Sequence, residues 1–154
     1  MGEFMAETLG SLCDKLTIVK LKQWHSKDKK KQKSLAQQNL LLQQEINQYI
    51  TDAVAGRIDK KLLTFAANKV YKKNGNAVAK VMGDLGAIIS QLAQTNCALW
   101  HEQEKVYEFD LVPNAEKSAV VKKLALLNLE RNHCMEAIDR QILKHASSKP
   151  SRGK

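Results

Sequence analysis

The sequence predicts an all-α fold, a four-helix bundle made from a duplicated helical hairpin with one extra connecting helix. Leu, Ala, Lys, Gln and Glu dominate the composition, and all five favour helices. The 154 residues include only two prolines and seven glycines, whereas hairpin-rich sheets need turn residues at short intervals. Apolar residues recur at steps of three and four, which is the helical period.

The length and the hydrophobic fraction of 44% predict a single domain with a packed core. We expect this helical-bundle domain to span residues 5–146. Residues 1–4, ahead of Met5, are interpreted as a cloning remnant, and 147–154 as a disordered basic tail. Within the domain, the two repeat halves are expected at about 7–54 and 77–145, with the connecting helix at about 58–73.

The first half of the repeat predicts two helices. The first runs over about 7–28 with a core stripe at Leu9, Leu12, Cys13, Leu16 and Val19. Ile18 and Leu21 fall outside this stripe, so the helix has a second apolar side and is either central in the fold or part of an oligomer interface. On the second alternative we expect a homodimer. Ser34 is the expected N-cap of the second helix, which ends near Val54 with Gly56 as its C-cap.

The second half repeats this arrangement. After the connecting helix, a long helix is expected from about 77 to 107. The break at 109–113 contains Pro113, and Asn114 is suited to cap the last helix.

The duplication is indicated by the two tryptophans, each of which is followed by histidine: Trp24-His25 and Trp100-His101. At the same shift of 76 positions, Asp28 corresponds to Glu104. In the helices that follow, Glu45 corresponds to Glu130. Two such hairpins packed face to face give a bundle with pseudo-twofold symmetry.

Two segments resemble a family of small bacterial helical proteins known as DUF4254. Residues 96–104, Asn-Cys-Ala-Leu-Trp-His-Glu-Gln-Glu, are similar to its N-x-x-L-W-H-x-E-D pattern, although Gln103-Glu104 stands in place of two acids. Residues 128–132 with Ile138-Asp139 resemble the family's L-N-x-x-R-N…I-D ending. Because the family has no assigned activity, the resemblance implies a helical fold and no specific chemistry.

A divalent-metal enzyme is one hypothesis for the repeated residues. His25 with Asp28, and His101 with Glu104, place an imidazole and a carboxylate one helical turn apart. With Glu45 and Glu130 the set matches the ligand count of di-metal helical bundles, although those proteins usually place Glu before His. At about 100° per residue, both histidines lie far from their core stripes, which opposes a site inside the bundle.

The alternative is that these residues anchor the hairpins or bind a ligand or partner. A tryptophan at the edge of a core stripe packs its ring while its N–H reaches a polar group. No phosphate-binding loop or nucleophile elbow is present, so we predict no cofactor and favour a protein that is not an enzyme. The candidate binding residues are Trp24, His25, Asp28, Asn96, Trp100, His101 and Glu104.

The net charge of +9 is concentrated in part at the first hairpin junction, in a basic patch at Lys27, Lys29, Lys30, Lys31 and Lys33. Such a patch favours an acidic or otherwise anionic partner. The leading interpretation is therefore a non-enzymatic binding or protein-interaction module. Nucleic-acid binding is a further alternative, but aromatic residues make up only 5% of the chain. Scattered cysteines and the lack of a long apolar segment predict a cytoplasmic protein without a transmembrane segment.

Overall fold

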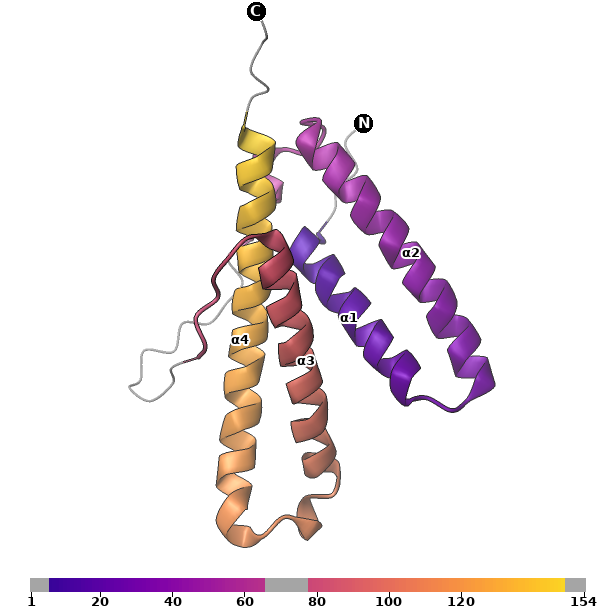
Figure 1. Ribbon diagram of the computed structural model, residues 1–154, viewed down its shortest axis with the longest axis vertical. Helices are drawn as coiled ribbons and strands as arrows, with labels where there is room; N and C mark the ends of the chain where they lie inside the picture. The colour runs from indigo at the N-terminus through magenta and orange to yellow at the C-terminus, as the bar shows by residue number, and fades with distance from the viewer. Residues whose placement is uncertain (1–5, 66–77, 149–154) are drawn as a thin grey trace, which may run out of the picture. The chain divides into compact units, whose positions relative to one another are not determined.

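The computed structural model describes residues 6–65 and 78–148, and no strand occurs among them. It contains four α-helices: α1 (Leu9–His25), α2 (Lys29–Val54), α3 (Leu85–Tyr107) and α4 (Asn114–Ser147). Two single turns of 3-10 helix, η1 (Lys60–Leu62) and η2 (Phe109–Leu111), lie in the connections (Figure 1). The predicted all-α class is confirmed. No helix in the described ranges is long and apolar enough to cross a membrane.

The chain divides into two compact units, which we describe one at a time. The first contains the α1–α2 hairpin and the last part of α4, from Met135 onward. The second contains α3, η2 and the first part of α4, up to Cys134. The first unit contains the first predicted hairpin, whereas the second predicted hairpin, about 77–145, is divided between the units at Cys134 and Met135. The pseudo-twofold symmetry between them stays a prediction.

The N-terminus of α1 is fixed by a carboxylate from α4. The first backbone N–H groups of a helix have no partner within the helix. Asp139 Oδ1 accepts the Gly10 N–H at 2.8 Å, and Thr8 caps the next position by accepting the Ser11 N–H at 3.3 Å. Asp139 is only 5% exposed, so a buried carboxylate takes the place of the acidic residue that the first turn of α1 lacks.

Gly10 also allows the backbones of α1 and α4 to touch. A Cβ atom built at Gly10 would overlap the backbone carbonyl group of Met135. No residue with a side chain fits at this crossing. The buried apolar side chains around it, such as Leu9, Leu12 and Ile138, form part of the core of this unit.

The end of α2 confirms the predicted C-cap. Gly56 has a φ of +75° and donates its N–H to the Ala53 carbonyl, while the Arg57 N–H reaches the Asp52 carbonyl at 2.9 Å. This pair of bonds is a Schellman motif, which glycine favours because it adopts positive φ without strain. The helix therefore ends where the sequence predicts.

Several predicted boundaries differ from the structure. The first helix, expected over about 7–28, spans Leu9–His25 as α1. Helix α2 begins at Lys29 with Asp28 as its N-cap, not after Ser34, because the Asp28 carboxylate accepts the N–H groups of Lys30 and Lys31. Helix α3 begins at Leu85, eight residues later than expected, because Gly83 has a φ of +102° and Asp84 caps the helix. In place of a helix from residue 58, the described part of the connection, 58–65, forms only the turn η1, and 66–73 lie outside the described residues.

The second unit is held together by polar contacts between α3 and α4. Glu130 on α4 accepts a hydrogen bond from Thr95 at 3.1 Å. One heptad away on each helix, Lys123 Nζ lies 2.8 Å from the Glu102 carboxylate. The two contacts share one antiparallel register, since each step toward the C-terminus of α3 matches an equal step back along α4. Polar pairs of this kind help to fix which residues face each other.

We expect Gly10→Ala to destabilise the protein by about 1–3 kcal/mol or more, because the new methyl group overlaps the Met135 backbone. Gly86→Ala is the matched control: nothing lies within 4 Å of its Cβ position in α3, so replacing this helical glycine should leave stability unchanged or raise it by up to about 1 kcal/mol. Chemical denaturation measures both. Equal effects of the two changes would contradict the close crossing of α1 and α4.

Burial raises the pKa of Asp139 to about 6, although its hydrogen bonds from Gly10 and Thr8 oppose the increase. A carboxyl group with a raised pKa binds its proton more tightly in the folded state. Proton binding by Asp139 therefore stabilises the fold most below pH 4, and this stabilisation is lost as the pH rises from about 4 to 6. Asn at this position keeps an acceptor for Gly10 without the buried charge.

We therefore expect the stability of Asp139→Asn, relative to the unaltered protein, to rise by about 2–3 kcal/mol between pH 4 and pH 7. Denaturant titrations across this range measure the difference. Comparing the variant with the unaltered protein at each pH cancels the effect of other carboxyl groups. Glu102 is one of these groups, and its two lysine partners lower its pKa. Parallel pH profiles for the two proteins would show that Asp139 does not titrate as described.

Candidate functional site

The two Trp-His pairs lie at different places in their helices. Trp24 and His25 are the last two residues of α1, whereas Trp100 and His101 lie inside α3, more than a turn before its end. Trp24 is 86% exposed, while Trp100 is half-buried and donates its Nε1–H to Glu104 Oε1 at 2.9 Å. Trp100 occupies the expected position at the edge of the core. The same prediction for Trp24 is wrong, because α1 ends beside it and nothing covers the ring.

The two carboxylates of the repeated motif also have different roles. Asp28 caps α2, with its Oδ1 accepting the backbone N–H groups of Lys30 and Lys31. Glu104 binds the Trp100 indole, and its other oxygen lies 3.8 Å from His101 Nδ1 on the surface of α3. Matching sequence positions therefore do not have matching chemistry.

The remaining metal candidates do not share an environment either. Glu45 is exposed on α2, whereas Glu130 is half-buried and accepts hydrogen bonds from α3. In the part of the chain that the structure describes, no three His, Cys, Asp or Glu side chains are placed so that they could hold a metal ion. Asn96, another candidate, is buried in α3 with only 1% of its surface exposed, so it does not present a contact surface.

Glu102 is a buried charged group that the motif analysis missed. It is 3% exposed and contacts both Lys105, at 3.1 Å, and Lys123, at 2.8 Å. The Lys123 contact and the neighbouring Lys105 lower the pKa of Glu102, so it stays ionised. The sequence could have indicated its burial, because Glu102 follows the buried Leu99 by three residues and so lies on the same inner face of α3. Its role is to join α3 to α4.

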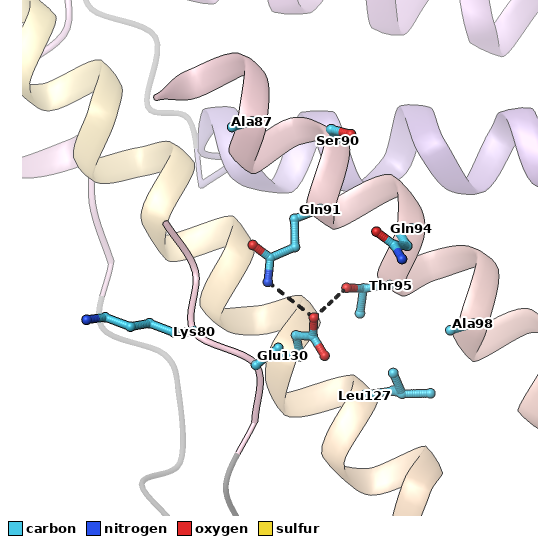
Figure 2. A pocket seen from close by; sticks show the side chains of 10 residues that line it. Lys80, Ala87, Ser90, Gln91, Gln94, Thr95, Ala98, Leu127 and Glu130 are labelled. Carbon is cyan, nitrogen blue, oxygen red and sulfur yellow. Dashed lines mark hydrogen bonds between the residues drawn. The ribbon is translucent and has the colours of Figure 1, made fainter. Parts of the chain in front are cut away.

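Figure 2 shows a pocket of about 470 Å³ in the second unit, between α3, α4 and the segment that precedes α3. Glu130 forms part of its wall, with one oxygen accepting hydrogen bonds from Gln91 at 3.2 Å and Thr95 at 3.1 Å. Lys80 extends away from Glu130 (Figure 2). The other walls are mainly small or neutral side chains such as Ala87, Gln94 and Ala98.

Two of the three cysteines are unsuited to nucleophilic chemistry. Burial raises the pKa of Cys13 and of Cys134 to about 11, so both thiols stay protonated at neutral pH. Since the thiolate is the nucleophile, neither is an activated catalytic group. Cys97, the third, is exposed.

The basic patch is the predicted feature that the structure places together most clearly. We define the basic tip as residues 24–33, which comprise the end of α1, the turn and the start of α2. Its five lysines, Lys27, Lys29, Lys30, Lys31 and Lys33, are all exposed. None of them forms an ion pair with a described residue.

The basic tip is also held in one conformation. The Gln32 side-chain amide donates to the carbonyls of Gln23 and Ser26, at 2.5 and 2.6 Å, and so satisfies groups left open at the end of α1. On the other side of the turn, Asp28 caps α2. The lysines are therefore presented by a fixed turn, which reduces the entropy lost when a partner binds.

No protein-family model matches this chain, and neither a curated protein nor a solved structure matches it.

We expect Trp24→Ala to change stability by less than about 0.5 kcal/mol, because the ring is exposed. Trp100→Ala should cost about 1–3 kcal/mol, because it removes half-buried packing and the bond to Glu104. Thermal or denaturant unfolding of the two variants measures this contrast. Similar losses would restore the prediction that the two Trp-His pairs are equivalent structural anchors.

Proposed function

We propose that this protein is a non-enzymatic interaction module that binds an acidic protein segment through the basic tip. The observation that carries the proposal is the exposure of five lysines, none ion-paired with a described residue, beside the 86% exposed Trp24 on a hydrogen-bonded turn. Tryptophan is among the residues that contribute most to protein interfaces when a partner covers it. Lysines around such an anchor attract and orient an acidic partner.

The positions of the lysines support a role in binding rather than in folding. The N-terminus of a helix has a partial positive charge, so nearby cations destabilise the helix and carboxylates stabilise it. Helix α2 nevertheless begins with three consecutive lysines and has no acidic residue in its first turn. The arrangement costs stability in the isolated chain, and an acidic partner would offset that cost.

The extent of the patch favours a protein partner over nucleic acid. From Ser34 to the end of α2 at Val54 there is no lysine or arginine, so the basic surface on this helix stops after its first turns. Nucleic-acid interfaces spread basic contacts over a larger area and often use arginine for paired contacts to phosphate. The tip contains no arginine and matches a short acidic segment better.

The metal-dependent enzyme stays an alternative prediction, and no described cluster of ligands favours it. Homodimerisation also stays a proposal. Its original support, the second apolar side of α1, is weak because Ile18 and Leu21 are already half-buried in the folded chain.

The proposal predicts that replacing Lys29, Lys30 and Lys31 with Glu lowers affinity for a labelled poly-glutamate peptide by at least about tenfold, which corresponds to about 1.4 kcal/mol. The same change should leave α2 equally or more stable, because acids then occupy its first turn. Fluorescence anisotropy at low salt measures binding, and circular dichroism measures stability.

The matched control replaces Lys60, Lys61 and Lys144 with Glu, which alters the net charge equally at exposed positions outside the tip. This control should bind the peptide within about twofold of the unaltered protein, apart from the small long-range effect of net charge. Equal loss in both triple variants would show a general charge effect and overturn the proposal. Binding of a DNA duplex or of anionic vesicles in preference to the peptide would also overturn it.

A further inference from the structure

The second hairpin ends in a tip with the opposite character. We define the acidic tip as residues 107–116, which comprise the end of α3, the turn η2 and the start of α4. It contains Glu108, Asp110 and Glu116 and no lysine or arginine, although the whole chain has a net charge of +9. Two large apolar side chains are also open to solvent there, Tyr107 at 80% and Leu111 at 78% exposed.

The charges of the acidic tip are left unpaired because the neighbouring lysines contact other groups. Lys105 and Lys123 both contact the buried Glu102, and the Lys117 ammonium lies 5.1 Å from the centre of the Phe109 ring. None of the three acidic residues forms an ion pair with a residue in the described ranges. Glu108 also lies at the C-terminus of α3, where the helix dipole disfavours negative charge.

The two tips therefore complement each other in charge and in apolar surface. The basic tip has five lysines and one carboxylate, which caps α2. The acidic tip has three carboxylates and no lysine or arginine. Each also exposes a large aromatic side chain, Trp24 or Tyr107. Opposite charges around apolar contacts are the arrangement that brings two protein surfaces together and fixes their orientation.

We propose that the acidic tip of a second copy of this chain is a partner of the basic tip. The inference rests on the proposed function and names the acidic segment that the basic tip binds. Trp24 of one copy would pack against Tyr107 and Leu111 of the next, with the lysines around Trp24 facing Glu108, Asp110 and Glu116. This contact joins two different surfaces, so it is a head-to-tail contact that can extend beyond a pair.

The small size of the tips predicts a weak association. Two tips of about ten residues each bury an area at the low end for specific interfaces, where contacts are transient. Because charge contributes much of the attraction, added salt should weaken it. For the unaltered protein, sedimentation velocity should show a mass that rises with concentration toward the millimolar range and falls when salt is added.

Neutralising one tip at a time tests the contact. Variant one replaces Lys29, Lys30 and Lys31 with Gln, and variant two carries Glu108→Gln, Asp110→Asn and Glu116→Gln. Each variant alone should stay monomeric at concentrations where the unaltered protein associates. An equal mixture should form a complex of one copy of each, because only the acidic tip of variant one and the basic tip of variant two remain intact.

Tryptophan fluorescence reports whether the tips themselves meet. In a Trp100→Phe background, Trp24 is the only tryptophan, and its emission should shift to shorter wavelength when the two variants are mixed. An association that leaves the emission of Trp24 unchanged would place the contact elsewhere on the molecule and overturn the inference.

The outcomes separate this inference from the proposed function. If the unaltered protein stays monomeric at every concentration, or if variant two associates as strongly as the unaltered protein, the second copy is not the partner. Variant two would then still bind poly-glutamate, and the proposed function would stand. If the basic tip binds neither the peptide nor the second copy, both proposals fail together.

Discussion

The structure of the first unit depends on how the N-terminus of α1 meets α4. Asp139 accepts the Gly10 N–H, and the absence of a side chain at Gly10 lets the backbone of α1 touch that of Met135. The ring of Tyr49 from α2 is buried near the same carboxylate, and burial together with the charge of Asp139 raises the pKa of Tyr49 to about 12. This buried contact joins α1 to α4 at the end of the α1–α2 hairpin opposite the basic tip.

The second unit uses charged groups for a similar purpose. Glu102 is buried between two lysines, and Glu130 accepts hydrogen bonds from Gln91 and Thr95. A buried carboxylate without partners would destabilise the fold, so these contacts strongly favour one register of α3 against α4. Glu102 and Glu130 therefore each have a partner on the other helix, and these contacts stabilise the packing of α3 against α4.

At the hairpin ends, the lysines of the basic tip and the acids of the acidic tip form no ion pair with a described residue. Lysines at the start of α2 and Glu108 at the end of α3 both oppose the dipoles of their helices. A residue that does not stabilise its own fold is a reasonable candidate for contact with another molecule. The exposed rings of Trp24 and Tyr107 support the same conclusion, since tryptophan and tyrosine are enriched in protein interfaces.

The sequence by itself determined the helical class, the four long helices and the end of α2 at Gly56, because periodicity and capping preferences are local properties. It also located the five lysines of the basic tip. Only the tertiary structure decided the roles of Asp28, Trp24 and Glu102, since a cap, an uncovered ring and a buried ion pair depend on where a helix ends and what packs against it. The Trp-His repeat shows this most clearly: identical neighbours in sequence acquire different environments when one pair lies at the end of α1 and the other lies within α3.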